Sequence, residues 1–125
     1  MTNRSRNQGE LEAEIMAVLW SSQSQGKAQL SSQEVAEKLN PERALAITTV
    51  LTVLSRLVDK DLVVRVPGPG RSLLFSAAQT REQHDASLLL RVFESSDNPL
   101  LAFSHFAKSL PQDQLDKLRQ SLQSE

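Results

Sequence analysis

Apolar and polar positions between Leu45 and Lys60 (LAITTVLTVLSRLVDK) separate into two continuous arcs when the segment is drawn as a helix. At about 100° per residue, one arc carries Ile47, Val50, Leu51, Val53, Leu54, Leu57 and Val58. The opposite arc carries Thr48, Thr49, Thr52, Ser55, Arg56, Asp59 and Lys60. The pattern predicts a helix of about four turns that buries one side in a core and leaves the other for water or a polar partner.

The first half of the polar arc is threonine, a β-branched residue with a mediocre preference for helices. Surface helices more often carry Glu, Lys and Gln at such positions. Short side chains with a hydroxyl and a methyl suit a helix that meets base edges and phosphates in a major groove. A solvated face that merely tolerates threonine fits the same residues, so this arc alone leaves both interpretations open.

Two more helices are predicted before this one. Leu11, Ile15, Val18 and Leu19 recur at helical spacing from Gly9 to about Ser22, and we expect Trp20 to pack at the end of the series. Residues 1–8 are expected to be a disordered tail that includes Arg4 and Arg6. The first turns would then hold Glu10, Glu12 and Glu14, where the helix dipole favours anions.

A short second helix is predicted from Ser31 and Glu34, which have the S-x-x-E spacing of a capping box. It follows the polar loop 21–29 and should turn Val35, Ala36 and Leu39 inward before Asn40-Pro41 ends it.

A β-hairpin is expected after Asp61. The valine-rich segment 62–66 predicts a strand bounded by Pro67, residues 67–70 a turn, and residues 72–77 the returning strand. Three helices followed by a hairpin predict a winged helix-turn-helix, whose second motif helix enters the major groove. The hairpin is then either a wing with Arg65 and Arg71 along the DNA backbone or an ordinary solvated hairpin.

Three further helices are predicted from Thr80 onward, with a break at residues 96–99 and Pro99 in a first helical turn. They carry more apolar residues than short helices bury among themselves, and such helices are marginal alone. We expect a two-fold partner to share these residues, although a tail folding back on its own domain is the alternative. The expected interface comprises Leu88, Leu89, Val92, Phe93, Leu101, Phe106, Leu115, Leu118 and Leu122.

These patterns together predict a mainly α fold with a small β-hairpin. We expect a winged helix-turn-helix DNA-binding domain over residues 9–78 and a C-terminal helical dimerisation region over residues 79–124.

Composition restricts how this chain can contact DNA. The net charge of −1 gives no global basic signature, so contact must come from a local patch. One Trp, four Phe and no Tyr argue against single-strand binding by stacked rings. The candidate DNA-binding residues are Arg43, Thr48, Thr49, Thr52, Arg56, Lys60, Arg65 and Arg71.

The sequence carries no pattern of a catalytic site. His84 and His105 lie in different predicted helices, the glycines form no phosphate loop, and no nucleophile–base set can be assembled. We therefore expect no enzyme activity, metal or cofactor. Without cysteine, disulfides and thiolate sites are excluded. We expect a cytoplasmic protein, because no apolar run approaches a membrane span and the first residues lack the apolar region of a secretion signal.

Two motifs resemble the penicillinase-repressor family (BlaI/MecI/CopY). The more specific is T-T-V-x-T-V-L-x-R-L from Thr48 to Leu57, and the second is L-x-x-x-I-M-x-x-L-W from Leu11 to Trp20. The resemblance extends over about residues 10–122. It implies a homodimeric winged-helix repressor of pseudo-palindromic operators that control β-lactamase or related resistance genes. The copper-responsive branch has a cysteine-rich tail, which this chain lacks.

The resemblance also implies roles for particular residues. Thr48, Thr52 and Arg56 would face DNA, and Arg71 would lie on the wing. A signalling protease would cut the tail before a phenylalanine, usually after asparagine in the family, and the counterpart here is His105-Phe106.

Two other functions fit the same fold. The first is a winged-helix protein-interaction module without DNA, since fold does not determine function. The second is a regulator that responds to a small molecule held between tail and winged domain.

Overall fold

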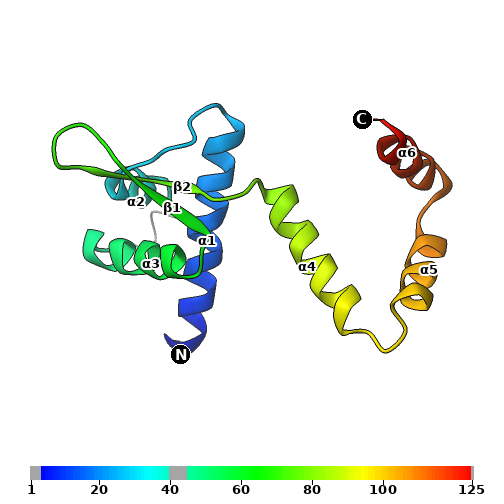
Figure 1. Cartoon of the computed structure of the whole chain (residues 1–125). Coiled ribbons are helices and arrows are strands. Elements are labelled where there is room, and N and C mark those ends of the chain that lie inside the picture. The colour runs from blue at the N-terminus through cyan, green and yellow to red at the C-terminus, as the bar shows by residue number, and fades with distance from the viewer. Residues whose placement is uncertain (1–3, 40–44, 125) are drawn as a thin grey trace. The chain divides into compact units, whose positions relative to one another are not determined.

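The computed structural model describes residues 4–39 and 45–124 of the chain. Two units are distinguished, Met1–Glu82 and Gln83–Glu125. The elements of the first unit, in chain order, are α1 (Arg4–Ser24), α2 (Ser32–Lys38), α3 (Ile47–Asp59), β1 (Val63–Pro67) and β2 (Leu73–Ala77) (Figure 1). Helices followed by an antiparallel hairpin confirm the expected mainly α fold of the winged helix-turn-helix type.

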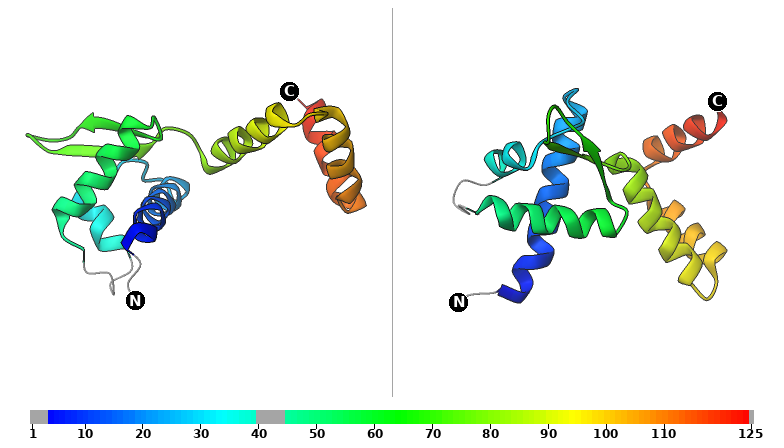
Figure 2. Two further views of the ribbon diagram at one scale, coloured as in Figure 1. Left: turned by 90° about the horizontal axis from the view of Figure 1, so that it is seen from below. Right: turned by 60° about the vertical axis from the view of Figure 1, so that its left-hand side comes forward.

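The core of the first unit forms where the apolar sides of α1, α3 and the hairpin meet. α3 runs across α1 rather than along it (Figures 1 and 2). Ile15, Leu19 and Leu54 have no exposed surface, and Phe75 from β2 is 1% exposed. Burying each such side chain stabilises the fold by about 1.5–3 kcal/mol. Trp20 packs against this core, as the sequence predicted.

α2 begins at the predicted capping box. The backbone N–H of Glu34 donates to the Ser31 hydroxyl at 3.1 Å, and the Ser31 N–H donates to the Glu34 carboxylate at 2.9 Å. The ammonium of Lys27 binds the same carboxylate and, with these bonds, holds the pKa of Glu34 below its ordinary value. Val35 and Leu39 are buried and Ala36 is half-buried, as expected. Asn40 and Pro41 lie outside the described residues.

The hairpin pairs Val63 with Ala77 at its base and Pro67 with Leu73 at its tip. Pro67 was expected to lie beyond the strand, but it is the strand's last residue. A proline is tolerated there because the strand end needs no further N–H donor. The turn closes with the N–H of Gly68 donating to the Ser72 carbonyl at 2.9 Å, and Gly70 adopts a φ of 63° that favours glycine.

The first helix corrects two expectations. α1 begins at Arg4, within the segment expected to be disordered. Glu10 and the two following glutamates therefore do not lie in its first turn, so the helix-dipole interpretation was wrong. Residues 4–8 contain no proline, and each residue added to an existing helix gains a hydrogen bond at little cost. The polar composition of this segment was therefore a poor guide to its backbone.

The second unit contains the rest of α4 (Arg81–Ser95), together with α5 (Pro99–Ser109) and α6 (Gln112–Gln123), as predicted. The Asn98 side chain accepts a hydrogen bond from the Leu101 N–H at 3.2 Å, and Pro99 occupies the first turn of α5. Phe93 and Phe103 pack edge to face at 6.5 Å between ring centres. No described residue of these three helices is buried.

Among the described residues, no helix is both long and apolar enough to cross a membrane.

Candidate nucleic-acid interface

α3 presents one side to the core and the other to solvent. Val50, Val53, Leu54 and Leu57 are buried, at most 3% exposed. The exposed opposite side carries Thr48, Thr49, Thr52, Ser55 and Arg56, and we call these residues the Thr/Arg face. α2 packs against α3, so the two helices form the helix-turn-helix pair. The Thr/Arg face is thus held on a rigid support and is open to a ligand.

The apolar arc of α3 is wider than the part of it that the core covers. Ile47 is 40% exposed and Leu51 36% exposed, although the helical wheel placed both on the buried side. They lie at the start of α3, which begins at Ile47 instead of Leu45 and has no side-chain cap at Ala46. On the wheel, Ile47 and Leu51 lie at one edge of the arc together with the half-buried Val58, whereas Val50, between them in the sequence, is fully buried. The core therefore covers only part of the width of the arc. Burial of the whole arc was therefore the wrong expectation.

The Thr52 hydroxyl cannot both donate and accept hydrogen bonds with a partner outside the protein. Its hydroxyl donates to the Thr48 carbonyl at 2.9 Å, a bond to the preceding turn that β-hydroxyl residues often make in helices. The hydroxyl proton is thereby used inside α3. The methyl group and an oxygen lone pair are left for a DNA partner.

Arg56 on α3 and Lys60 at its C-terminal cap differ in their surroundings. The Lys60 ammonium binds the Glu12 carboxylate of α1 at 2.8 Å, so it joins the end of α3 to α1. Arg56 has no ion pair within the described part of the chain and is exposed. Arg56 therefore provides the positive charge of the Thr/Arg face, and Lys60 has a structural contact that sequence reasoning missed.

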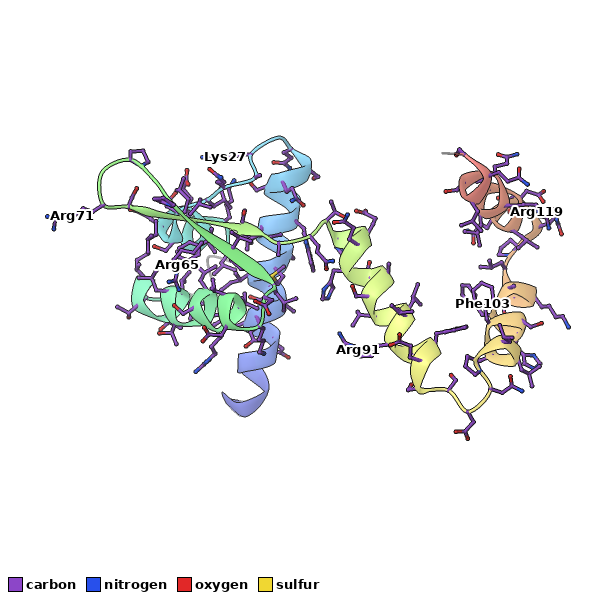
Figure 3. The ribbon with its side chains drawn as sticks, in the orientation of Figure 1. Lys27, Arg65, Arg71, Arg91, Phe103 and Arg119 are labelled. Atoms are coloured by element: carbon purple, nitrogen blue, oxygen red, sulfur yellow. The ribbon has the colours of Figure 1, made fainter. Side chains whose placement is uncertain are left out.

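The hairpin arginines lie in different places. Arg71 follows Gly70 at the exposed tip of the hairpin and points away from it (Figure 3). Arg65 is paired with Phe75 in the register, so the two side chains project from the same face of the hairpin. Phe75 is buried in the core on that face. Both arginines are exposed. Arg43, the remaining candidate, lies outside the described residues.

The second unit has an apolar surface that is not covered in the chain. Of the predicted interface residues, Phe93 and Leu115 are half-buried and the others exposed, up to 77% for Leu122. α4 and α5 also form an apolar groove whose lining includes Ala86, Leu89, Leu90, Phe93, Phe103 and Phe106. Leu90 and Phe103 were missing from the predicted interface. The apolar arc of α4 is wider than the narrow stripe used to choose residues, and counting every leucine at positions 88–90 would have included Leu90.

The predicted cleavage position lies inside a regular helix. His105 and Phe106 belong to α5, and Phe106 is 45% exposed. A protease requires an extended strand of substrate, so cleavage here needs α5 to unwind locally.

Comparison with known proteins identifies relatives over nearly the whole chain. The model of the family described as penicillinase repressor matches residues 8–124. The protein named transcriptional regulator BlaI in Mycobacterium tuberculosis, strains CDC 1551 and H37Rv, is 32% identical over 117 residues. The match covers 91% of this chain and 81% of that protein.

Comparison with solved structures matches two MarR regulators over most of the chain. A mutant MarR from E. coli has a TM-score of 0.41 at 18% identity, covering 94% of this chain and 87% of that one. A MarR-family transcriptional regulator from Rhodococcus sp. RHA1 has a TM-score of 0.39 at 17% identity, covering 96% and 86%. The extent of the family match decides the identification: the chain belongs to the penicillinase repressor family of DNA-binding transcriptional regulators and is not an enzyme.

Proposed function

We propose that this protein is a homodimeric, sequence-specific repressor that binds pseudo-palindromic operators of β-lactamase or related antibiotic-response genes in the cytoplasm. The observation that carries the proposal is the Thr/Arg face of α3, exposed along one side while Val50, Leu54 and Leu57 anchor the other in the core. A helix held in this way presents short side chains at the depth of a major groove.

Each exposed residue has a proposed role. Thr48, Thr49 and Thr52 contact base edges and sugar–phosphate groups, with the Thr52 methyl directed to an apolar partner such as a thymine methyl. Arg56 contacts a guanine edge or a phosphate from the same face. Arg71 at the wing tip, Arg65 and Arg43 neutralise phosphates and position the domain without reading sequence. Lys60 is assigned to stabilising α3 against α1 through Glu12.

The exposed apolar surface of the second unit supports dimerisation through this unit. α4, α5 and α6 contain no buried residue in their described parts. Their large apolar side chains are instead exposed to solvent, with Leu89, Val92 and Leu100 at 64%, 65% and 75%. A second copy that covers these side chains removes apolar surface from water at about 25 cal/mol per Å². Closed two-fold symmetry then places two α3 helices on two half-sites of opposite orientation.

Selection of DNA by the full-length protein tests the proposal. The protein is mixed with a randomised double-stranded library at moderate salt, and bound duplexes are recovered and sequenced. We expect two inverted half-sites about 10 base pairs apart and a molecular mass in solution of two chains. A variant with Arg56→Gln and Thr52→Ala should lose the selected preference. Recovery of unrelated sequences would refute sequence-specific binding and favour the protein-interaction module.

Control by proteolysis is the remaining part of the proposal. Cleavage at His105-Phe106 would release the end of α5 and all of α6, including Leu115, Leu118 and Leu122 from the proposed interface. We expect the protein cut at this bond to be monomeric and to bind the selected duplex less tightly. Replacing Phe106 by proline should abolish cutting by the activating protease. A dimer that persists after cutting would contradict this route to induction.

A further inference from the structure

Trp20, the single tryptophan of the chain, contacts the segment that joins the hairpin to α4. Its indole N–H donates to the backbone carbonyl of Gln79 at 3.0 Å. The guanidinium carbon of Arg81, the first residue of α4, lies 5.8 Å from the centre of the indole ring, within the range of a cation–π interaction. All three residues belong to the first unit, and we call them the Trp20 latch.

The connector held by this latch is short. Only residues 78–80 separate the end of β2 from the start of α4. The N–H of Ala78 donates to the Leu62 carbonyl at 2.9 Å, one residue before the carbonyl that Trp20 binds. Hydrogen bonds to a backbone fix the path of the chain itself, unlike contacts to side-chain ends. The connector is therefore tied to the start of the hairpin and to α1 within two consecutive residues.

We propose that Trp20 is a positioning residue that determines how strictly the dimer reads the separation of its two half-sites. This inference rests on the proposed function, because it requires two copies joined through the second unit. α4 begins at Arg81, so the latch holds the connector and the first residue of this helix against α1. Trp20 lies on α1 and belongs to no part of the Thr/Arg face, so it acts on spacing and not on base contact.

The physical reason lies in how a connector sets the effective concentration at the second half-site. When one protomer is bound to its half-site, a loose connector lets the α3 of the other protomer occupy many positions. Affinity at the best half-site spacing is then lower, and duplexes with other spacings are also bound. A held connector concentrates that α3 at one spacing and excludes the rest. Releasing the latch should therefore flatten the dependence of affinity on spacing and leave each half-site contact unchanged.

The test compares Trp20→Phe and Arg81→Gln with wild type in the full chain. Trp20→Phe keeps an aromatic ring against the core but removes the N–H donor together with one ring of the indole. Arg81→Gln leaves the indole intact and removes the cation over it. Arg91→Gln is the matched control, because it removes the same charge from an exposed position on the same helix, ten residues beyond Arg81. The Arg91 side chain is labelled in Figure 3. The probe is the symmetric duplex selected by wild type, with versions whose half-sites are separated by additional single base pairs.

We expect Trp20→Phe to bind the parent duplex about threefold to tenfold more weakly, the effect of losing one hydrogen bond. Arg81→Gln should bind it about twofold to fivefold more weakly, the effect of losing one exposed cation–π contact. Both variants should lose less affinity than wild type as the half-sites are moved apart. Affinity for an isolated half-site should not change, and amide exchange at residues 78–82 of the free protein should become faster. Arg91→Gln should follow wild type in every measurement.

Three results would overturn the inference, and they differ in what else they overturn. A folded Trp20→Phe protein with the wild-type spacing profile and wild-type exchange would refute the role of Trp20 alone. Wild-type protein that selects no symmetric duplex would refute the proposed function and this inference together. A lower unfolding temperature with an unchanged spacing profile would identify Trp20 as a packing residue only.

Discussion

Replacing Thr52 by valine and by serine separates the two chemical groups with which this side chain can contact DNA. Thr52→Val removes the hydroxyl and keeps the branched shape, whereas Thr52→Ser removes the methyl and keeps the hydroxyl. Because the hydroxyl proton is donated to the Thr48 carbonyl at 2.9 Å, it is already used inside α3. We therefore expect the methyl to contribute more to operator binding than the hydroxyl.

The expected magnitudes follow from this difference. Losing one methyl from an apolar contact costs about 0.8 kcal/mol, which is about fourfold in affinity. Losing a hydrogen bond that reads a base costs about 1–3 kcal/mol, or about fivefold to 150-fold. Thr52→Ser should thus weaken binding about fourfold, and Thr52→Val should remain within about twofold of wild type. Stability should change by less than about 0.5 kcal/mol in both, since Thr52 is exposed.

Fluorescence anisotropy at one fixed salt concentration measures these affinities on the selected duplex and on a scrambled duplex of equal length. Thermal unfolding of each variant is measured in parallel to show that the fold is intact. Ser87→Ala is the matched control, because the Ser87 hydroxyl makes the same type of bond in α4, to the Gln83 carbonyl at 3.1 Å. Removing it should leave both affinities unchanged.

The opposite ranking would refute this reasoning. If Thr52→Val lost more than about fivefold while Thr52→Ser bound as wild type does, the hydroxyl would be reading a base. The bond to Thr48 would then have to break when DNA binds, and its presence in the free protein would not predict the role of the residue.

Three other predictions follow from the charges and exposed surfaces. Arg71→Gln should reduce the slope of log K against log salt by about 1, with Arg91→Gln unchanged; equal slopes for Arg71→Gln and wild type would exclude a phosphate contact from the wing tip. Since bonding to Lys27 and Ser31 lowers the pKa of Glu34 in the folded state, the folded protein binds fewer protons there than the unfolded chain. The stability advantage of wild type over Glu34→Gln, measured by urea unfolding, should be complete above the ordinary pKa of 4.5 and shrink as pH falls below it; a constant difference would show that the bonds do not matter. Val92→Glu should convert the dimer to monomer in sedimentation, while an unchanged dimer would move the interface away from α4.

Local patterns were sufficient for much of this fold. Three features depend on contacts within a few residues. They are the helical spacing of apolar residues around Leu54 in α3, the capping box at Ser31, and the break before Pro99. The Thr/Arg face follows from the same helical period, because burying one side of α3 leaves the other exposed. These features are properties of short segments, and their sequence signals lie in the segments themselves.

Contacts between distant segments required the tertiary structure. Lys60 was predicted to bind DNA from its place on the polar arc, and its contact with Glu12 joins residues 48 positions apart. The hydrogen bond from Trp20 to Gln79 joins residues 59 positions apart, and no local sequence pattern predicts it. The part of the apolar arc of α3 that the core covers, which leaves Ile47 and Leu51 exposed, is likewise decided by neighbouring elements.

The sequence by itself therefore determined which side of each helix is apolar, where the helices begin and end to within a few residues except at the start of α1, and which family the chain resembles. Only the tertiary structure decided which polar residues remain available to a ligand. The physical reason is that periodicity and capping are short-range effects of backbone geometry, whereas an ion pair or a hydrogen bond to a remote carbonyl exists only after packing brings the two groups together.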